Sequence, residues 1–171
     1  MFFRVVSNED VCCPNCGAKL KKKGWVKRIM KLPGGIKTWR YIEVRQCTSE
    51  NCRHKHRLLP DDNLPYKHYQ RETIEKVIDN DFTEEELLEI EDYPCEATIC
   101  RWRSWAIQLV KNTEGKIRSV LHDTFELSDR FLATTDSLLE EIKRRIPQGW
   151  MATIFRVIIN SGGIGAIPQT T

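Results

Sequence analysis

Apolar and polar residues alternate along the chain between residues 25 and 45, and this alternation predicts two β-strands. Aromatic and aliphatic side chains alternate with lysine and arginine over 25–32 and again over 36–45. A period of two residues is that of a strand with one packed face and one solvated face. Pro-Gly-Gly at 33–35 predicts a hairpin turn, and residues 2–6 predict a short leading strand that pairs with the hairpin. The face expected to pack carries Trp25, Ile29, Trp39 and Tyr41, while the other face stays charged.

Beyond residue 66 the apolar positions recur with the period of a helix. A first helix is expected over 67–80. A second begins at Thr83, where Thr-Glu-Glu-Glu forms a capping box that satisfies the free amides of a first turn. A third runs from about Glu96 to about Lys111, and Gly115 is expected to break the pattern. The apolar face of this third helix holds Ile99, Trp102, Ala106, Leu109 and Val110.

The last third of the chain predicts further helices. Asp136 and Ser137 can cap a helix that Pro147 ends. The apolar run over 150–159 predicts a buried helix that packs on the helices before it, with a strand as the alternative for so short a run. The residues after 162 are expected to fray.

Two cysteine pairs flank the predicted hairpin: Cys13 with Cys16 and, after thirty intervening residues, Cys47 with Cys52. Four thiolates at this spacing are the typical ligands of one tetrahedral Zn²⁺ in a short, strand-rich segment. Four thiolates also complete the coordination shell and leave no open position for a substrate. The sequence therefore predicts a structural zinc ion.

Three neighbouring residues are alternative ligands. Cys12 directly precedes Cys13, but a Cys-x-x-Cys-Gly turn, whose glycine permits a positive φ, favours Cys13. His54 and His56 follow Cys52 closely, and the second pair has four intervening residues where two are commoner. Either histidine thus remains an alternative to one cysteine.

Together these elements predict an α+β chain, with an N-terminal β zinc ribbon followed by an all-α helix-turn-helix bundle. The expected divisions are a ribbon over 1–58, a proline-rich linker over 59–66, a trihelical helix-turn-helix unit over 67–112, a helical C-terminal extension over 113–162 and a flexible tail over 163–171.

Charge is distributed unevenly. Residues 1–67 hold 15 Lys or Arg and 6 Asp or Glu, whereas residues 68–112 hold 5 and 11. A basic segment attracts polyanions by counterion release, which indicates nucleic acid. Basic strands interleaved with aromatics suit phosphate contact and stacking, although an ordinary half-buried ribbon explains the same pattern. The candidates for phosphate contact are Lys21, Lys22, Lys23, Lys27 and Arg28.

The expected third helix has an outer face of small, polar and basic residues that can hydrogen-bond base edges or phosphates. A short helix, a turn and a longer helix form a helix-turn-helix, whose second helix enters the major groove. The alternative is an ordinary three-helix bundle with a solvated face. The candidates for DNA contact on this helix are Thr98, Arg101, Ser104, Gln108 and Lys111.

Several other classes of protein are not favoured. No window approaches eighteen uninterrupted apolar residues, and the first six residues are too short a run for a secretory signal. Seven cysteines without an export signal indicate a reducing cytoplasm, here at the nucleoid. A zinc deaminase needs His-x-Glu, which this chain lacks. Asp123, Asp129 and Asp136 lie on a helical pattern rather than on the strands of a transposase acidic triad, so no enzyme activity is expected.

The chain resembles a family of small bacterial proteins, largely from Firmicutes, that has no assigned function and is often linked to mobile elements. The resemblance covers about residues 11–162. It rests on the Cys-Pro-x-Cys-Gly turn, the run 45–78 with its Leu-Pro-Asp and Pro-Tyr-Lys motifs, the Thr98-Ile99 and Arg101-Trp102 motifs, and the Gly149–Ser161 tail. The ribbon is similar to those at the N-termini of insertion-sequence transposases. The resemblance supports the expected architecture.

The expected function is that of a non-enzymatic DNA-binding protein, either associated with a mobile element or a transcriptional regulator. A protein adaptor for a transposase or recombinase and an RNA-binding module are the alternatives. Binding to phosphates distinguishes these classes because it weakens steeply with salt.

Overall fold

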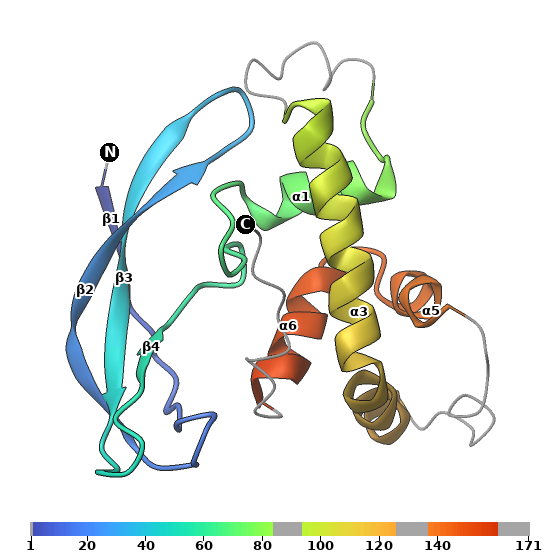
Figure 1. Cartoon of the computed structure of the whole chain (residues 1–171). Coiled ribbons are helices and arrows are strands. Elements are labelled where there is room, and N and C mark those ends of the chain that lie inside the picture. The colour runs from blue at the N-terminus through green and yellow to red at the C-terminus, as the bar shows by residue number, and fades with distance from the viewer. Residues whose placement is uncertain (1, 84–93, 126–136, 161–171) are drawn as a thin grey trace. The chain divides into compact units, whose positions relative to one another are not determined.

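The structure is a computed structural model that describes residues 2–83, 94–125 and 137–160 (Figure 1). It divides into two compact units, Met1–Cys95 and Glu96–Thr171. The first unit contains a β-sheet and one described helix, and the second contains three described helices. The predicted α+β class is therefore confirmed at this level.

The sheet of the first unit is built around β3 (Lys37–Cys47), which pairs antiparallel with β2 (Leu20–Lys31). Strand β1 (Phe2–Val5) pairs parallel with the first half of β3, and β4 (Lys55–Arg57) pairs antiparallel with its last residues. The predicted hairpin and its leading strand are thus confirmed. Gly34 and Gly35 form the turn, with φ of 72° and 70°.

The two faces of the hairpin are reversed relative to the sequence-based prediction. Met30 and Ile42 are completely buried on the face opposite the tryptophans, whereas the side chain of Trp39 is 37% exposed. The buried face lies against the segment predicted as a linker, because Arg40 Nη1 bonds Asp62 at 2.7 Å and the Lys31 amide donates to the His68 carbonyl at 2.7 Å. Residues 59–66 are therefore part of the first unit.

Helix α1 (Arg71–Asp79) is shorter than the predicted 67–80 because the preceding residues extend the sheet. Tyr69 bridges Lys31 at the end of β2, and the Gln70 amide donates to the Lys31 carbonyl at 3.0 Å. Asn80 ends the helix in the left-handed conformation, with its amide bonded to the Lys76 carbonyl. The capping box predicted at Thr83 involves residues 84–86, which lie outside the described residues.

The second unit is organised around α3 (Glu96–Phe125), which continues well beyond the predicted end near Lys111. The predicted break at Gly115 was wrong. A glycine in a helix costs only about 1 kcal/mol relative to alanine, and Ile117, one half-turn further on, is buried at 1% exposure. Burial of the later turns of the helix outweighs this local cost.

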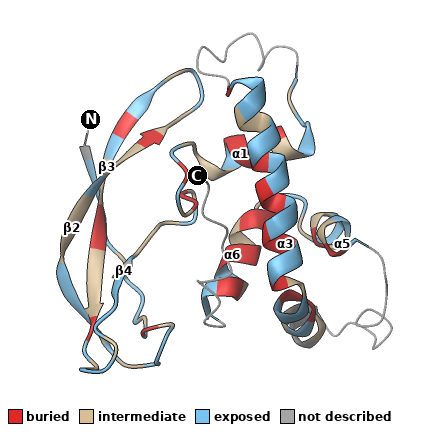
Figure 2. Cartoon of the chain, viewed as in Figure 1, coloured by how far each residue is buried: buried red, intermediate tan, exposed pale blue. Residues whose placement is uncertain are grey.

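Helices α5 (Leu138–Arg145) and α6 (Trp150–Asn160) complete the described part of the second unit. The Ser137 hydroxyl accepts from the Glu140 amide, as the predicted cap requires, and the run after Gly149 is a helix rather than a strand. Trp105 of α3 stacks on Phe155 of α6 with ring centroids 5.8 Å apart. Figure 2 shows the buried stripes of these helices.

The predicted helix-turn-helix remains a prediction. Helix α1 belongs to the first unit and α3 to the second, and residues 84–93, which would contain the middle helix and the turn, are outside the described ranges. Among the described helices, none has the length and apolar character needed to cross a bilayer.

Candidate metal centre and basic surfaces

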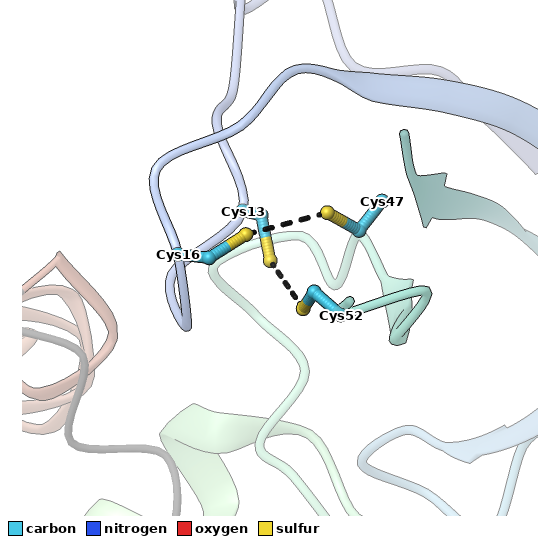
Figure 3. Close-up of side chains that lie close together, drawn as sticks. All are labelled: Cys13, Cys16, Cys47 and Cys52. Atoms are coloured by element: carbon cyan, nitrogen blue, oxygen red, sulfur yellow. Dashed lines mark hydrogen bonds between the residues drawn. The ribbon is translucent and has the colours of Figure 1, made fainter. Parts of the chain in front are cut away.

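Two turns at one end of the hairpin bring four cysteine thiols together (Figure 3). All four sulfur atoms lie within 4.8 Å of one another. The Sγ atoms of Cys13 and Cys52 are 3.7 Å apart, and those of Cys16 and Cys47 are 3.4 Å apart. Zn–S bonds of 2.3 Å give a tetrahedron whose edges are about 3.8 Å long. The cluster thus has the dimensions needed to hold one tetrahedral metal ion.

The first turn runs from Cys13 to Gly17 and is closed by its own backbone. The Gly17 amide donates to the Cys13 carbonyl at 2.7 Å, and the Cys13 amide donates to the Ala18 carbonyl at 2.8 Å. Gly17 has φ of 72°, as the predicted Cys-x-x-Cys-Gly turn requires. Cys12 is exposed and bridges Lys19, so that Cys13 rather than Cys12 belongs to the cluster.

The second turn runs from Cys47 to His54 and accommodates the four residues between its cysteines. The amides of Cys52 and Arg53 both donate to the Ser49 carbonyl, at 3.2 and 3.0 Å, and the Cys47 amide donates to the His54 carbonyl at 2.9 Å. The Thr48 amide donates to the Lys19 carbonyl at 3.0 Å and joins the two turns. The hairpin therefore positions both halves of the cluster.

The two histidines lie beside the thiols. His56 Nε2 is 3.3 Å from Cys13 Sγ, and His54 Nδ1 is 3.4 Å from Cys52 Sγ. Their rings are stacked, with centroids 6.4 Å apart. An imidazole N–H at this distance can donate to a metal-bound thiolate and fix its orientation. The structure thus groups four cysteines and places the histidines around them, which favours the all-cysteine set.

The environment shifts the pKa values of the thiols in opposite directions. For Cys13, burial raises the pKa, but hydrogen bonds from the Asn15 and Cys16 backbone and from His56 outweigh it and lower the pKa to about 6. Burial, helped by the neighbouring thiols, raises the pKa of Cys47 to about 12. Without a metal, Cys47 therefore stays protonated at neutral pH, and a cation must displace its proton to bind there.

The predicted phosphate contacts on β2 have different environments. Lys21, Lys22, Lys23 and Lys27 are exposed. Arg28 is half-buried, and its Nη2 donates to the carbonyls of Leu64, at 2.6 Å, and Lys67. Burial and the charge of Arg57 lower the pKa of Arg28. Arg28 therefore binds the 64–67 segment to the sheet, a role that the sequence did not indicate.

Lysines and tryptophans share the solvent-facing side of the sheet. Lys22 Nζ lies 4.5 Å from the centroid of the Trp25 ring, and Lys27 Nζ lies 4.1 Å from that of Trp39. Arg4 of β1 also approaches Trp25, at 5.8 Å. We call this surface the aromatic–basic face; it consists of Arg4, Lys22, Trp25, Lys27 and Trp39. Sequence analysis considered stacking by the aromatic residues of these strands but expected the tryptophans on the packed side of the hairpin.

The predicted DNA contacts on α3 form a stripe. Arg101, Ser104, Gln108 and Lys111 are exposed and follow the three- and four-residue spacing of one helix face, whereas Thr98 is half-buried. Arg101 Nε donates to the Ala97 carbonyl at 3.2 Å, and its Nη2 donates to the Thr98 hydroxyl at 3.0 Å. The guanidinium thus lies along its own helix in this structure.

Comparison with known proteins gives one family. A family model described as a domain of unknown function (DUF6431) matches residues 13–102, which is more than half of the chain. The match includes all four clustered cysteines, the hairpin, α1 and the first residues of α3. No curated protein and no solved structure matches the chain.

Proposed function

The chain belongs to the DUF6431 family of domains of unknown function, and we propose that it is a non-enzymatic protein that binds double-stranded DNA. In this proposal a structural zinc ion holds the two cysteine turns together. Helix α3 is the second helix of a helix-turn-helix and enters the major groove. The exposed lysines of β2 contact phosphates.

Zinc is proposed because of the donor set. Four thiolates in a tetrahedral arrangement are soft ligands that select Zn²⁺ or iron over the hard cations Mg²⁺ and Ca²⁺. The raised pKa of Cys47 is a second reason, because a bound cation favours the thiolate form of this buried sulfur. The metal would supply folding energy to the turns and take no part in a reaction.

The exposed stripe of α3 carries the DNA-binding proposal. Between Arg101 and Lys111 the helix carries no carboxylate, and Glu114, one turn further on, is ion-paired with Arg118 at 2.8 Å. A negatively charged duplex can therefore approach this face. Arg101, Ser104 and Gln108 are proposed to contact bases, because arginine and glutamine form paired hydrogen bonds with guanine and adenine edges.

Selection from a pool of random duplexes tests this proposal. The zinc-loaded full chain is expected to enrich a defined sequence, and affinity for that sequence is expected to fall steeply as salt rises. Enrichment of no sequence, with no salt-sensitive binding to any duplex, would exclude this function. If the chain bound no duplex but bound a purified transposase or recombinase in the same buffer, the adaptor alternative would be favoured. The association with mobile elements belongs to the proposal and rests on the sequence resemblance.

A further inference from the structure

We propose that the aromatic–basic face of the sheet binds an unpaired nucleic acid strand, with Trp25 and Trp39 stacking on bases and the adjacent cations contacting phosphates. The proposed function gives the ribbon only phosphate contacts to a duplex. This inference rests on that function for the kind of partner, nucleic acid, but involves neither α3 nor its stripe. It assigns a binding role to two residues, Trp25 and Trp39, that were expected to pack in the core.

The charge of the sheet suits a polyanion. Strands β1, β2 and β3 together carry ten Lys or Arg residues and a single acidic residue, Glu43. Glu43 is 2% exposed, and its carboxylate accepts from Arg45 Nε at 2.7 Å. The one carboxylate of these strands is therefore buried and neutralised, and the sheet presents an almost purely positive surface to a partner.

The strand register places both tryptophans on one side of the sheet. Trp25 pairs with Glu43, Lys27 with Tyr41, and Ile29 with Trp39. Residues that pair directly across two strands point to the same face. The rings of Trp25 and Trp39 are thus two rows apart, a separation of about 14 Å from strand rise and spacing. Two bases of one strand can each stack on a ring, with the intervening nucleotides crossing Lys27 and Tyr41.

Stacking selects an unpaired strand over a duplex. The flat faces of bases are covered by neighbouring base pairs in a duplex, so aromatic side chains on a sheet can reach them only when the bases are unstacked. The lysines above the tryptophans assist, because a long flexible ammonium can move from the ring to a phosphate when a base takes its place. Each ring and its lysine therefore form a matched pair of contacts for one nucleotide.

An anionic membrane is the other polyanion that tryptophan and lysine could meet. Here, the ammonium groups lie directly over the indole rings. The side chains of such long cations could reach lipid phosphates, but Trp39 is only 37% exposed and Trp25 is half-buried, so the rings lie against the sheet and do not project far enough to insert into hydrocarbon. A nucleic acid strand instead places a phosphate and a base together at the same position. The geometry favours the strand.

The experiment titrates the zinc-loaded full chain against labelled 15-mers of dT and of U, a random-sequence duplex, and vesicles of phosphatidylserine and phosphatidylcholine. Intrinsic fluorescence gives a second readout, because Trp102, Trp105 and Trp150 are at most 5% exposed and a stacking base can quench only Trp25 and Trp39. We expect both 15-mers to bind and to quench. Binding of only one of the two 15-mers would also support the proposed role of this face, and would show whether it prefers a DNA or an RNA strand.

Matched variants separate stacking from charge. Trp39→Ala and Trp25→Ala are each expected to weaken strand binding by about 5-fold to 150-fold. Trp39→Phe retains an aromatic ring and should recover most of the strand affinity that Trp39→Ala loses. A variant that lost affinity because its sheet misfolded would not show this recovery. Tyr66→Ala removes a more exposed aromatic residue of the same unit, 54% exposed and outside this face, and should leave strand affinity unchanged. Zinc content confirms that each variant keeps its cysteine turns.

The outcomes distinguish this inference from the proposed function. Strand affinity that is unchanged by both tryptophan substitutions would overturn the inference, as would quenching by vesicles without binding of either 15-mer. If a selected duplex binds through Arg101 but no strand binds, the inference fails and the proposed function stands. If the strands bind through the tryptophans and no duplex is selected, the proposed function fails and the inference stands.

Discussion

Gly17 and Arg53 occupy the same position in the two cysteine turns: each directly follows the second cysteine of its pair, and each has a left-handed backbone, with φ of 72° and 45°. In both turns the amide of this residue donates to a carbonyl four residues back, that of Cys13 for Gly17 and that of Ser49 for Arg53. The second turn thus repeats the ending of the first. It does so with a residue whose side chain disfavours that conformation.

Opposite substitutions at these two positions should therefore change stability in opposite directions. Gly17→Ala places a Cβ in a left-handed conformation and is expected to cost about 1–2 kcal/mol, although nothing lies within 4 Å of that Cβ. Arg53→Gly should gain about 0.5 kcal/mol, because relief of strain exceeds the added chain entropy. Urea unfolding of the zinc-loaded chain measures both. Arg53→Ala removes the charge and keeps the strain, so a gain equal to that of Arg53→Gly would contradict the backbone explanation.

Removal of one clustered thiol should release the metal. Cys47→Ser is expected to abolish stoichiometric zinc and to unfold the two turns, because the proposed zinc ion would contribute folding energy there. Cys12→Ser is the matched control: its thiol neighbours the cluster in sequence but lies outside it. Metal content after dialysis, together with proteolysis of the ribbon, checks both. A Cys47→Ser chain that retained one zinc per molecule would show that another group, such as His54 or His56, completes the site.

The contact proposed for α3 is tested by a pair of arginines on the same helix. Arg101→Ala is expected to weaken binding to the selected duplex by about 1–3 kcal/mol and to relax the base preference at one position. Arg103→Ala removes the same charge from a neighbouring exposed position off the stripe and should reduce specific and non-specific binding equally. The ratio of specific to random-duplex affinity, measured at fixed salt, is the deciding quantity. An equal ratio for the two variants would remove Arg101 from base contact.

Helix α5 carries an ion-pair cluster that makes stability depend on pH. Hydrogen bonds and charge from Arg144 and Arg145 lower the pKa of Glu141 to about 2, below its usual value of 4.5. A carboxyl whose pKa is lowered by folding stabilises the protein above its unfolded pKa, so this contribution is present above pH 4.5 and is lost as the pH falls toward 2. Glu141→Gln should flatten the stability profile in that window, whereas Glu140→Gln should not. The pair is partly exposed, so the difference should stay below about 1 kcal/mol.

The sequence predicted features that short-range patterns determine. The hairpin follows from alternation and a Pro-Gly-Gly turn, the α5 cap from Ser137, and the cysteine cluster from cysteine spacing. Features that depend on distant residues were missed. The segment after Pro60 covers one face of the hairpin, and this contact rather than side-chain size determines that Met30 is buried and Trp39 exposed. Likewise, α3 continues through Gly115 because Ile117 is buried within its unit.

Arg28 and Lys27 are adjacent on β2 and were predicted to share one role, yet they face opposite sides of the sheet. Arg28→Ala leaves the Leu64 and Lys67 carbonyls without this donor and should destabilise the first unit by about 1–3 kcal/mol. Lys27→Ala removes a cation above Trp39 and should cost less than about 1 kcal/mol of stability. The effects on nucleic acid binding should be the reverse of those on stability. Lys27→Ala is expected to lower by about 1 the slope of the logarithm of affinity against the logarithm of salt concentration, whereas Arg28→Ala should leave this slope unchanged. Unfolding curves and salt titrations of the two variants measure this, and equal salt slopes would place both residues, or neither, at the interface.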